Sequence, residues 1–265
     1  MRILITGGTG FIGRALVMRL LRRGDALTVL SRDPPKAAAL LGDRVRIWKS
    51  LGQWRADTAF DAVINLAGEP IIDKAWTPER KRLLLASRIG ITGQLLDGIR
   101  HCQQKPAVLL SGSAIGIYGD TGTAICTESS PLADDFAATL CRQWERAAEP
   151  AEPLGVRTVF LRTGLVLHQD GGMLKKLLLP FKLGLGSRLG DGRQTMSWIH
   201  RHDYLNAVIF LLDNTECRGA FNLTAPHPVS NAGFADALAV RLGGKALLVT
   251  PSLLLRPAMR SERLS

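Results

Sequence analysis

The sequence has few cysteines, and they do not cluster. Cys102, Cys126, Cys141 and Cys217 stand far apart in a chain of 265 residues, and no two of them form a CxxC pair. This spacing argues against a zinc site and a thioredoxin-like motif, and is typical of reduced thiols. Met1 leads directly into a strand pattern, which leaves no room for a signal peptide. Because no apolar stretch reaches the ~18 residues of a membrane span, we expect a cytoplasmic protein with no membrane partner.

Aromatic residues and long runs of one charge are also scarce. Aromatics make up 6% of the chain, and 34 Lys and Arg against 23 Asp and Glu give a net charge of +11. The densest basic clusters are Arg22-Arg23, Arg80-Lys81-Arg82 and Lys175-Lys176. A basic balance fits a nucleic acid, an anionic cofactor or a solvated basic face. The scatter of the charges and the few aromatics argue against a nucleic-acid partner.

Strand and helix patterns alternate along most of the chain. The predicted strands are residues 2–6, 26–30, 44–48, 61–66, 107–111, 156–162 and 219–223, and the predicted helices are residues 11–23, 77–102, 134–149, 203–212 and 231–242. This alternation predicts an α/β fold, a doubly wound parallel sheet with helices on both faces. The pattern loosens after Gly164. We therefore expect a dinucleotide-binding Rossmann domain in residues 1–164 and a smaller C-terminal lobe, interleaved with it, in residues 165–265.

A glycine-rich segment, TGGTGFIG, joins the first strand to the first helix. Gly7, Gly10 and Gly13 form GxxGxxG, in which glycine permits a tight turn, a close approach to a pyrophosphate and close packing of helix on strand. The helix N-terminus adds free N–H groups and a positive dipole end. No Gly-Lys-Ser/Thr follows, which excludes a Walker A loop. We predict a dinucleotide site that includes Gly7, Thr9, Gly10, Phe11, Ile12 and Gly13.

The residues that end the second strand indicate which dinucleotide binds. NAD sites usually carry an acid here for the ribose 2′-hydroxyl. This chain has Ser31 and Arg32 instead, with Asp33 slightly later. A guanidinium beside a hydroxyl suits a 2′-phosphate, so the pattern favours NADP(H) over NAD(H). Two alternatives stay open: Asp33 facing the ribose, and Arg32 as an ordinary surface charge.

Longer motifs resemble a known family. MRILITGGTGFIG, INLAGEPI, SGSAIGIYGD and LRTGLVL resemble the extended short-chain dehydrogenase/reductases. INLAGEPIIDKAWT, ASRIGIT, LLPFKLGLGSRLGDGRQTMSWIHRHD and FNLTAPHPVSNAGFADAL are similar to its atypical subgroup, the epimerase family proteins. The likeness covers residues 1 to about 250. The resemblance implies that members usually continue into a further C-terminal helical segment beyond the point where this sequence stops, either because this sequence is shortened or because it diverges there. An apolar surface left exposed there would promote a homodimer through residues 251–265.

The resemblance implies further cofactor contacts. Leu66 and Ala67 would pack along the adenosine half, Arg88 would reach the phosphates or ribose, and Leu161 and Thr163 would lie near the nicotinamide. Simpler interpretations stay open. Leu66 and Ala67 fit plain core packing, and Arg88 fits a salt bridge on the helix surface.

The catalytic pattern of the superfamily is missing. Active members pair Tyr and Lys as YxxxK on one helical face, where the ammonium lowers the tyrosine pKa. The chain has two tyrosines, Tyr118 and Tyr204, and neither has a lysine four residues on. In the helix that should carry the motif, the tyrosine position falls at Phe136 or Ala137 and the lysine position at Cys141.

Other side chains are candidate substitutes. Ser113 would hydrogen-bond a substrate carbonyl or cap its own loop, and Tyr118 would act as the acid or simply pack. Cys141 fits a small buried hydrophobe better than a nucleophile. His200 and His202 form HxHD with Asp203, but the segment matches a lobe contact in which Asp203 caps a helix, so we expect no metal.

Two functions from different classes remain. The first is an NADP(H)-binding oxidoreductase or epimerase-like enzyme acting on an unidentified small molecule, with Ser113 and Tyr118 as candidate catalytic residues. The second is a non-catalytic NADP(H)-binding redox sensor or regulatory protein, which the missing YxxxK pair favours. A nucleic-acid-associated protein would rest on the net charge alone.

Overall fold

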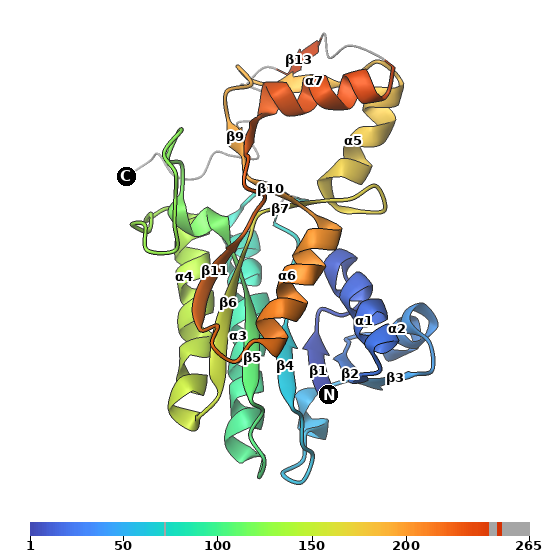
Figure 1. The fold of residues 1–265 in the computed structure, drawn as a ribbon, viewed down its shortest axis with the longest axis vertical. Helices are drawn as coiled ribbons and strands as arrows, with labels where there is room; N and C mark the ends of the chain where they lie inside the picture. The colour runs from blue at the N-terminus through green and yellow to red at the C-terminus, as the bar shows by residue number, and fades with distance from the viewer. Residues whose placement is uncertain (72, 244–247, 251–265) are drawn as a thin grey trace.

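The computed structural model describes residues 1–71, 73–243 and 248–250, and its centre is a parallel sheet of seven strands (Figure 1). The strand order is β3-β2-β1-β4-β5-β6-β11, and every neighbouring pair is parallel. The order reverses between β1 and β4, so a crevice for a ligand is expected at the carboxyl ends of these two strands. The strands are β1 (Arg2–Thr6), β2 (Ala26–Leu30), β3 (Val45–Trp48), β4 (Ala62–Asn65), β5 (Val108–Ala114), β6 (Arg157–Thr163) and β11 (Gly219–Leu223).

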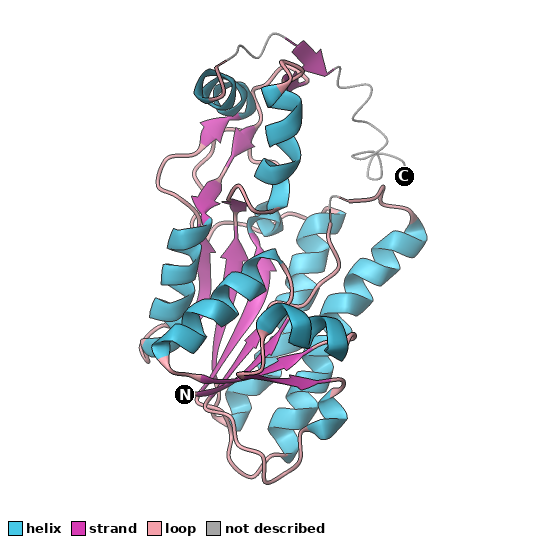
Figure 2. Cartoon of the chain, turned by 90° about the vertical axis from the view of Figure 1, so that its right-hand side faces the viewer, coloured by secondary structure: helices cyan, strands magenta, loops and turns pink. Residues whose placement is uncertain are grey.

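Helices cover both faces of this sheet (Figure 2). One face packs against α1 (Phe11–Arg23), α2 (Pro34–Leu41) and α6 (Arg201–Asp213), and the other against α3 (Pro78–His101) and α4 (Phe136–Ala148). Alternate residues of β1 serve the two layers. Ile3 and Ile5 lie under α1, while Leu4 lies on the α3 side, and all three are fully buried. The predicted doubly wound α/β fold is confirmed.

A smaller lobe stands beyond the carboxyl end of the sheet (Figure 1). Its elements are β7 (Leu165–Leu167), α5 (Gly172–Lys182), β8 (Ser187–Leu189), β9 (Thr195–Met196), β10 (Trp198–His200), β12 (Val229–Ser230), α7 (Asn231–Arg241) and β13 (Leu248–Thr250). The strands pair as β7 with β10, β9 with β12 and β8 with β13. Phe181 of α5 packs on Ala235 and Ala239 of α7, forming a small core separate from the main ones.

After β10 the chain leaves the lobe, forms α6 and β11 in the layers of the main sheet, and enters the lobe again at β12. Both α6 and β11 belong to the sheet layers, so residues 165–265 contribute to both parts, as the predicted interleaving requires. Arg157 of β6 fixes this return, since its guanidinium donates to the carbonyls of Leu211, Leu212 and Cys217 at 2.7–3.0 Å. The end of α6 is thereby tied to the neighbouring strand.

Some local elements differ from the predictions. The helices α2 and α5 were not predicted, because α2 is only eight residues long and α5 begins at a glycine and contains Pro180. At the start of α6, His200 occupies the N-cap position and accepts a bond from the His202 amide, while the expected cap Asp203 lies in the first turn. Short 3₁₀ helices are η1 (Leu51–Gln53), η2 (Ile115–Tyr118) and η3 (Glu149–Leu154).

Two further predictions concern membrane-spanning helices and self-association. Among the residues that the structure describes, every helix is too short or too polar to cross a bilayer. The predicted self-association through residues 251–265 lies outside the described residues.

Candidate functional site

The glycine segment forms a tight turn held between β1, α1 and the residues after β4. Gly7 has φ 71°, a left-handed conformation that favours glycine, and its carbonyl accepts the Gly10 amide at 3.0 Å. A Cβ on Gly7 would collide with the backbone of Leu66 and Ala67, and a Cβ on Gly13 would collide with the backbone of Gly7. Two of the predicted glycines are therefore required by close backbone contacts.

The N-terminus of α1 opens beside this turn. Gly10 is its N-cap in an extended conformation, and within the described part of the chain α1 has neither a side-chain cap nor an acid in its first turn. The amides of Phe11, Ile12 and Gly13 therefore keep no intrahelical partner. A Cβ on Gly10 would meet, among described atoms within 4 Å, only the carbonyl oxygen of Gly7 at 3.3 Å. This helix end fits the pyrophosphate of a dinucleotide.

Arg32 stands at the end of β2 with its side chain 92% exposed, and its Nη1 donates to Oε1 of Glu69 at 3.0 Å. Arg32 holds the pKa of Glu69 below its usual value, against the opposing effect of burial. Arg80 lies 3.5 Å from the second oxygen of Glu69. Asp33, the alternative ribose ligand, instead caps α2 by accepting the Lys36 amide, and Ser31 bonds the backbone of Asp33.

Leu66 and Ala67 come together with the glycine turn. Leu66 donates its amide to the Thr6 carbonyl and Ala67 donates to the Thr6 hydroxyl, both at 3.2 Å. Both residues keep partial exposure, so they border the site, and Leu66 also packs on the core.

Arg88 is committed to the protein itself. It exposes 6% of its surface, donates to the carbonyls of Glu69 at 2.9 Å and Leu84 at 3.2 Å, and lies over the ring of Trp144. Burial lowers the pKa of this guanidinium. Arg88 therefore braces the loop after β4, and the salt bridge considered for it is not the interaction observed. Its contact with phosphate or ribose stays a prediction.

The two residues expected near the nicotinamide differ in access. Thr163 is partly exposed, donates to the Leu161 carbonyl at 3.0 Å and lies 3.2 Å from the Tyr204 hydroxyl. Leu161 is fully buried in the core, so its side chain offers no surface to a cofactor in this structure. Burial raises the pKa of Tyr204 to about 12, which keeps its phenol neutral.

Ser113 and Tyr118 meet in one buried polar network. The Ser113 hydroxyl donates to Glu145 at 2.6 Å, and Arg162 binds both oxygens of the same carboxylate at 2.9 and 3.0 Å. Arg162 also donates to the Tyr118 hydroxyl at 2.8 Å, and that hydroxyl donates to Asn222 at 2.7 Å. Glu145 and Arg162 expose 7% and 6% of their surface. The structure thus joins the two candidate catalytic residues through an ion pair.

The other candidates have simpler surroundings. Burial raises the pKa of the Cys141 thiol to about 11, so the nucleophilic thiolate is suppressed near neutral pH. The ring of His200 lies 5.6 Å from that of His168, and the His200 Nδ1 accepts the His202 amide. No group of three His, Cys, Asp or Glu side chains in the described ranges is arranged to hold a metal ion.

Sequence reasoning missed Glu69 and the pairing of Glu145 with Arg162. Glu69 follows β4 at the same sheet edge as Arg32, so the rule that parallel strands end together could have placed it opposite Arg32. Arg162 is the register partner of Ser113 on the neighbouring strand. A correct pairing of β5 with β6 would have brought it to the network.

The fold and the glycine turn together define a class of protein. A parallel sheet in the order 3-2-1-4-5-6, with a glycine turn opening α1, is the doubly wound dinucleotide-binding arrangement. The model of the NAD dependent epimerase/dehydratase family matches residues 3–224. The chain belongs to this family, and the predicted kinship with its epimerase family proteins is confirmed.

Individual epimerase family proteins are similar to this chain over most of its length. The chain is 36% identical to the chloroplastic epimerase family protein SDR39U1 homolog of Arabidopsis thaliana, over 97% of this chain and 75% of that protein. It is 38% identical to an epimerase family protein of Staphylococcus aureus, over 96% of this chain and 84% of the relative. A crystal structure of human epimerase family protein SDR39U1 (isoform 2) with NADPH matches with a TM-score of 0.88 and 34% identity, covering 97% of this chain and 85% of the human one.

Proposed function

We propose that this protein binds NADP(H) at the glycine turn and is an oxidoreductase or epimerase-like enzyme acting on a small molecule. The observation that carries the proposal is the open N-terminus of α1 together with Arg32, 92% exposed at the end of β2. The first suits a pyrophosphate and the second a 2′-phosphate. The human relative whose structure was solved with NADPH supports this choice of cofactor.

The residues of this chain would divide the work of binding. The amides of Phe11, Ile12 and Gly13 would hold the pyrophosphate, Leu66 and Ala67 would border the adenosine half, and Arg32 would bind the 2′-phosphate. A bound nicotinamide supplies or accepts a hydride. The substrate would lie at the carboxyl edge of the sheet, between it and the lobe that contains α5 and α7. A cytoplasmic location remains part of this proposal.

Proton transfer would rest on the buried network. Tyr118 is the candidate acid, and the guanidinium of Arg162 takes the place of the cation that the missing lysine would provide. To reach a substrate, the Tyr118 hydroxyl must release Asn222, and Ser113 must release Glu145. Enzymatic turnover therefore requires a rearrangement of these bonds when substrate binds.

The buried and already paired hydroxyls of Tyr118 and Ser113 favour a second candidate function. Tyr118 exposes 5% of its surface and Ser113 exposes 4%, and both hydroxyls already have partners. A protein that binds NADP(H) without turning it over, as a redox sensor or regulatory partner, needs no free acid. In that case the network only stabilises the edge where β5 and β6 end.

The experiment is a screen for NADPH oxidation, followed by nicotinamide absorbance, against aldehydes, ketones and nucleotide sugars. Turnover that falls by about 10²-fold or more in Tyr118→Phe supports the enzyme with Tyr118 as its acid. Cofactor binding without turnover of any compound supports the sensor. Turnover that is unchanged in Tyr118→Phe removes the role proposed for Tyr118.

A further inference from the structure

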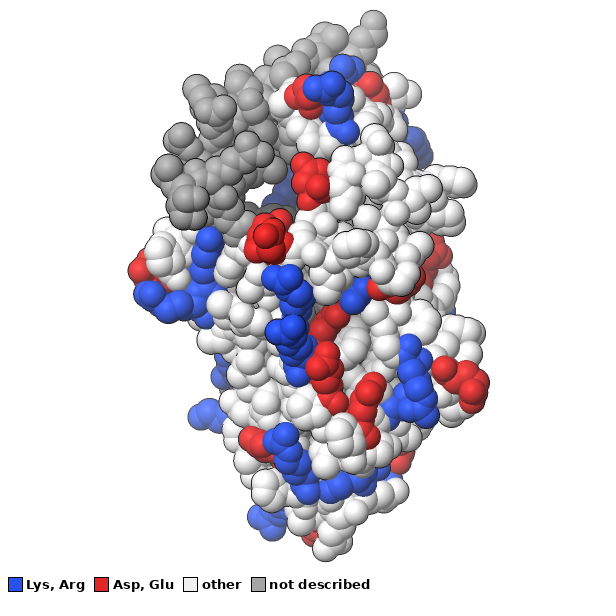
Figure 3. Space-filling model, turned by 90° about the vertical axis from the view of Figure 1, so that its left-hand side faces the viewer, with Lys and Arg blue, Asp and Glu red and all other residues white. Residues whose placement is uncertain are grey.

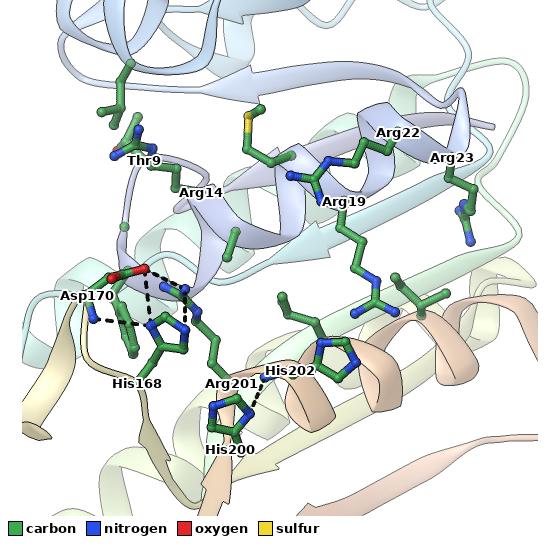
Figure 4. A pocket seen from close by; sticks show the side chains of 17 residues that line it. Thr9, Arg14, Arg19, Arg22, Arg23, His168, Asp170, His200, Arg201 and His202 are labelled. Atoms are coloured by element: carbon green, nitrogen blue, oxygen red, sulfur yellow. Dashed lines mark hydrogen bonds and ion pairs between the residues drawn. The ribbon is translucent and has the colours of Figure 1, made fainter.

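A long groove runs along the outer side of the molecule between α1 and α6 (Figure 4). It begins beside the glycine turn at Thr9 and Gly10 and continues along α1 as far as Arg22 and Arg23. Its volume is about 1160 Å³. Small-molecule sites enclose most of their ligand in roughly 300–1,000 Å³. A larger, open groove fits an extended polymer better than a small metabolite.

Basic side chains line this groove. Arg14, Arg19, Arg22 and Arg23 project from α1, and Arg201 stands at the start of α6 (Figure 4). Three histidines, His168, His200 and His202, lie at the same end as Arg201. Among the described residues that line the groove, Asp170 is the one acid, and Arg201 binds it at 3.0 Å.

Two of these arginines, Arg14 and Arg22, are available to a ligand, whereas Arg19 and Arg23 already have partners. Arg23 binds Asp25 and Asp213, and Arg19 donates to Asn206. Arg14 and Arg22 are exposed, and neither guanidinium has a hydrogen-bond or ion-pair partner within residues 1–71, 73–243 and 248–250. By contrast, the side of the molecule that carries α4 shows Lys and Arg next to Asp and Glu (Figure 3). The groove therefore has an excess of basic side chains, whereas basic and acidic side chains are mixed on the side that carries α4 (Figure 3).

The floor of the groove is aliphatic. Its aliphatic lining residues are Ala15 and Met18 of α1, Leu40 of α2, and Leu205 and Ile209 of α6, and all except Leu205 retain partial exposure. The ring of Phe11 is covered by other residues, because it packs on Gly171 and lies under the guanidinium of Arg201. The groove thus combines an apolar base with a basic rim.

We propose that this groove binds an acidic amphipathic helix of a partner protein. Such a helix would bury its apolar face on Met18 and Ile209 and place carboxylates against the rim. Arg14 and Arg22 are about 12 Å apart along α1, the rise of eight helical residues. Glutamates eight residues apart on a partner helix have the same separation along its axis, so a helix lying along α1 can present a carboxylate to each arginine.

The shape and the floor disfavour a nucleic acid. A duplex is read by a protruding helix or ribbon that enters its groove, whereas this surface is concave. Single strands are held by bases stacked on exposed aromatic rings. The ring of Phe11 is already covered, and the other residues of the floor are aliphatic. The aliphatic floor instead matches the leucine-rich face of an amphipathic helix.

The test uses a fluorescent peptide of about 20 residues, long enough to be helical, with leucines along one face and glutamates beside them. A matched peptide carries Gln in place of every Glu. Anisotropy titrations with full-length protein are expected to show binding of the Glu peptide that weakens between about 50 mM and about 300 mM salt. The Gln peptide is expected to bind at least about tenfold more weakly.

Variants locate the binding on the protein. The variant R14E/R22E is expected to lose about tenfold or more in affinity for the Glu peptide. The control R44E/R55E makes the same change in net charge with two exposed arginines outside the groove, and should change the affinity less than about twofold. Melting temperatures of both variants verify folding. Met18→Glu, which charges the floor without touching an arginine, should also abolish binding.

Three results would overturn the proposal. The first is equal binding of the Glu and Gln peptides. The second is an equal loss in R14E/R22E and R44E/R55E, which would mean that net charge alone attracts the peptide. The third is a single-stranded RNA that binds more tightly than the Glu peptide and is released by R14E/R22E, which would assign the groove to nucleic acid.

Discussion

The guanidinium of Arg32 lies 3.0 Å from the carboxylate of Glu69, across the sheet edge where a dinucleotide would bind. Glu69 is also within 3.5 Å of Arg80, and its backbone amide donates to the Ser87 hydroxyl. Its position therefore does not depend on Arg32. A 2′-phosphate that binds Arg32 has to compete with a carboxylate that is already in place.

Glu69→Gln is expected to strengthen NADPH binding about threefold, because the exposed pair that it removes is worth at most ~1 kcal/mol. NADH lacks the 2′-phosphate and should bind with unchanged affinity. Fluorescence titrations with both cofactors measure the effect. Glu79→Gln removes an equal charge at an exposed pair with Arg82 and serves as the control. Equal tightening for NADPH and NADH would show that Glu69 does not compete for the 2′-phosphate.

Gly10→Ala and Gly13→Ala should differ in what they disturb. A methyl on Gly10 meets the Gly7 carbonyl oxygen at 3.3 Å and has no other described neighbour within 4 Å, but in the proposed site it would occupy space needed by the pyrophosphate. That variant is expected to keep its melting temperature within a few degrees and to lose NADPH binding. A methyl on Gly13 collides with the backbone of Gly7, so Gly13→Ala is expected to lower the melting temperature and also to lose NADPH binding. Unimpaired NADPH binding by Gly10→Ala would move the pyrophosphate away from this turn.

Glu145→Gln is expected to lower the free energy of unfolding by about 3 kcal/mol, because it leaves the buried guanidinium of Arg162 without its counter-charge. Glu149→Gln changes an exposed acid at the end of the same helix and should cost under about 0.5 kcal/mol. Denaturant titrations compare the two. A loss for Glu145→Gln no larger than that for Glu149→Gln would mean that the pair with Arg162 is dispensable to the fold.

Cys141 should be inert in the folded protein. Burial raises its pKa to about 11 from an ordinary 9.0, so its thiol keeps its proton when an unfolded thiol would lose it. Stability should therefore fall as pH rises above about 9, because the unfolded state then releases the proton first. At pH 8, a thiol reagent followed by mass spectrometry is expected to modify the half-buried Cys126 and Cys217 well before Cys141. Rapid modification of Cys141 at that pH would restore it as a candidate nucleophile.

Local patterns were enough to predict most of the framework. The first strand and the first helix begin and end at the predicted residues, because the apolar periodicity and the glycines at their ends depend on neighbouring residues alone. The glycine turn is equally local. The cap of α7 is local as well, since the Ser230 hydroxyl accepts the amide of Gly233.

Contacts between distant segments were not predicted. Glu69 meets Arg32, and Glu145 meets Arg162, only after the sheet has brought separate strands together. The basic groove arises in the same way, because α1 and α6 lie far apart in the sequence. The weakly clustered charges of the sequence become a lined groove only in the folded chain.

The most direct test of the account is a side-by-side titration of the protein with NADPH and NADH, followed by nicotinamide fluorescence, for the wild type and Arg32→Ala. The account predicts that the wild type prefers NADPH. Arg32→Ala should weaken NADPH binding by roughly 2–3 kcal/mol, the strength of a charged hydrogen bond, with little change for NADH. Equal losses for both cofactors would mean that Arg32 does not bind the 2′-phosphate. No binding of either cofactor by the wild type would contradict the central claim that the glycine turn is a working NADP(H) site.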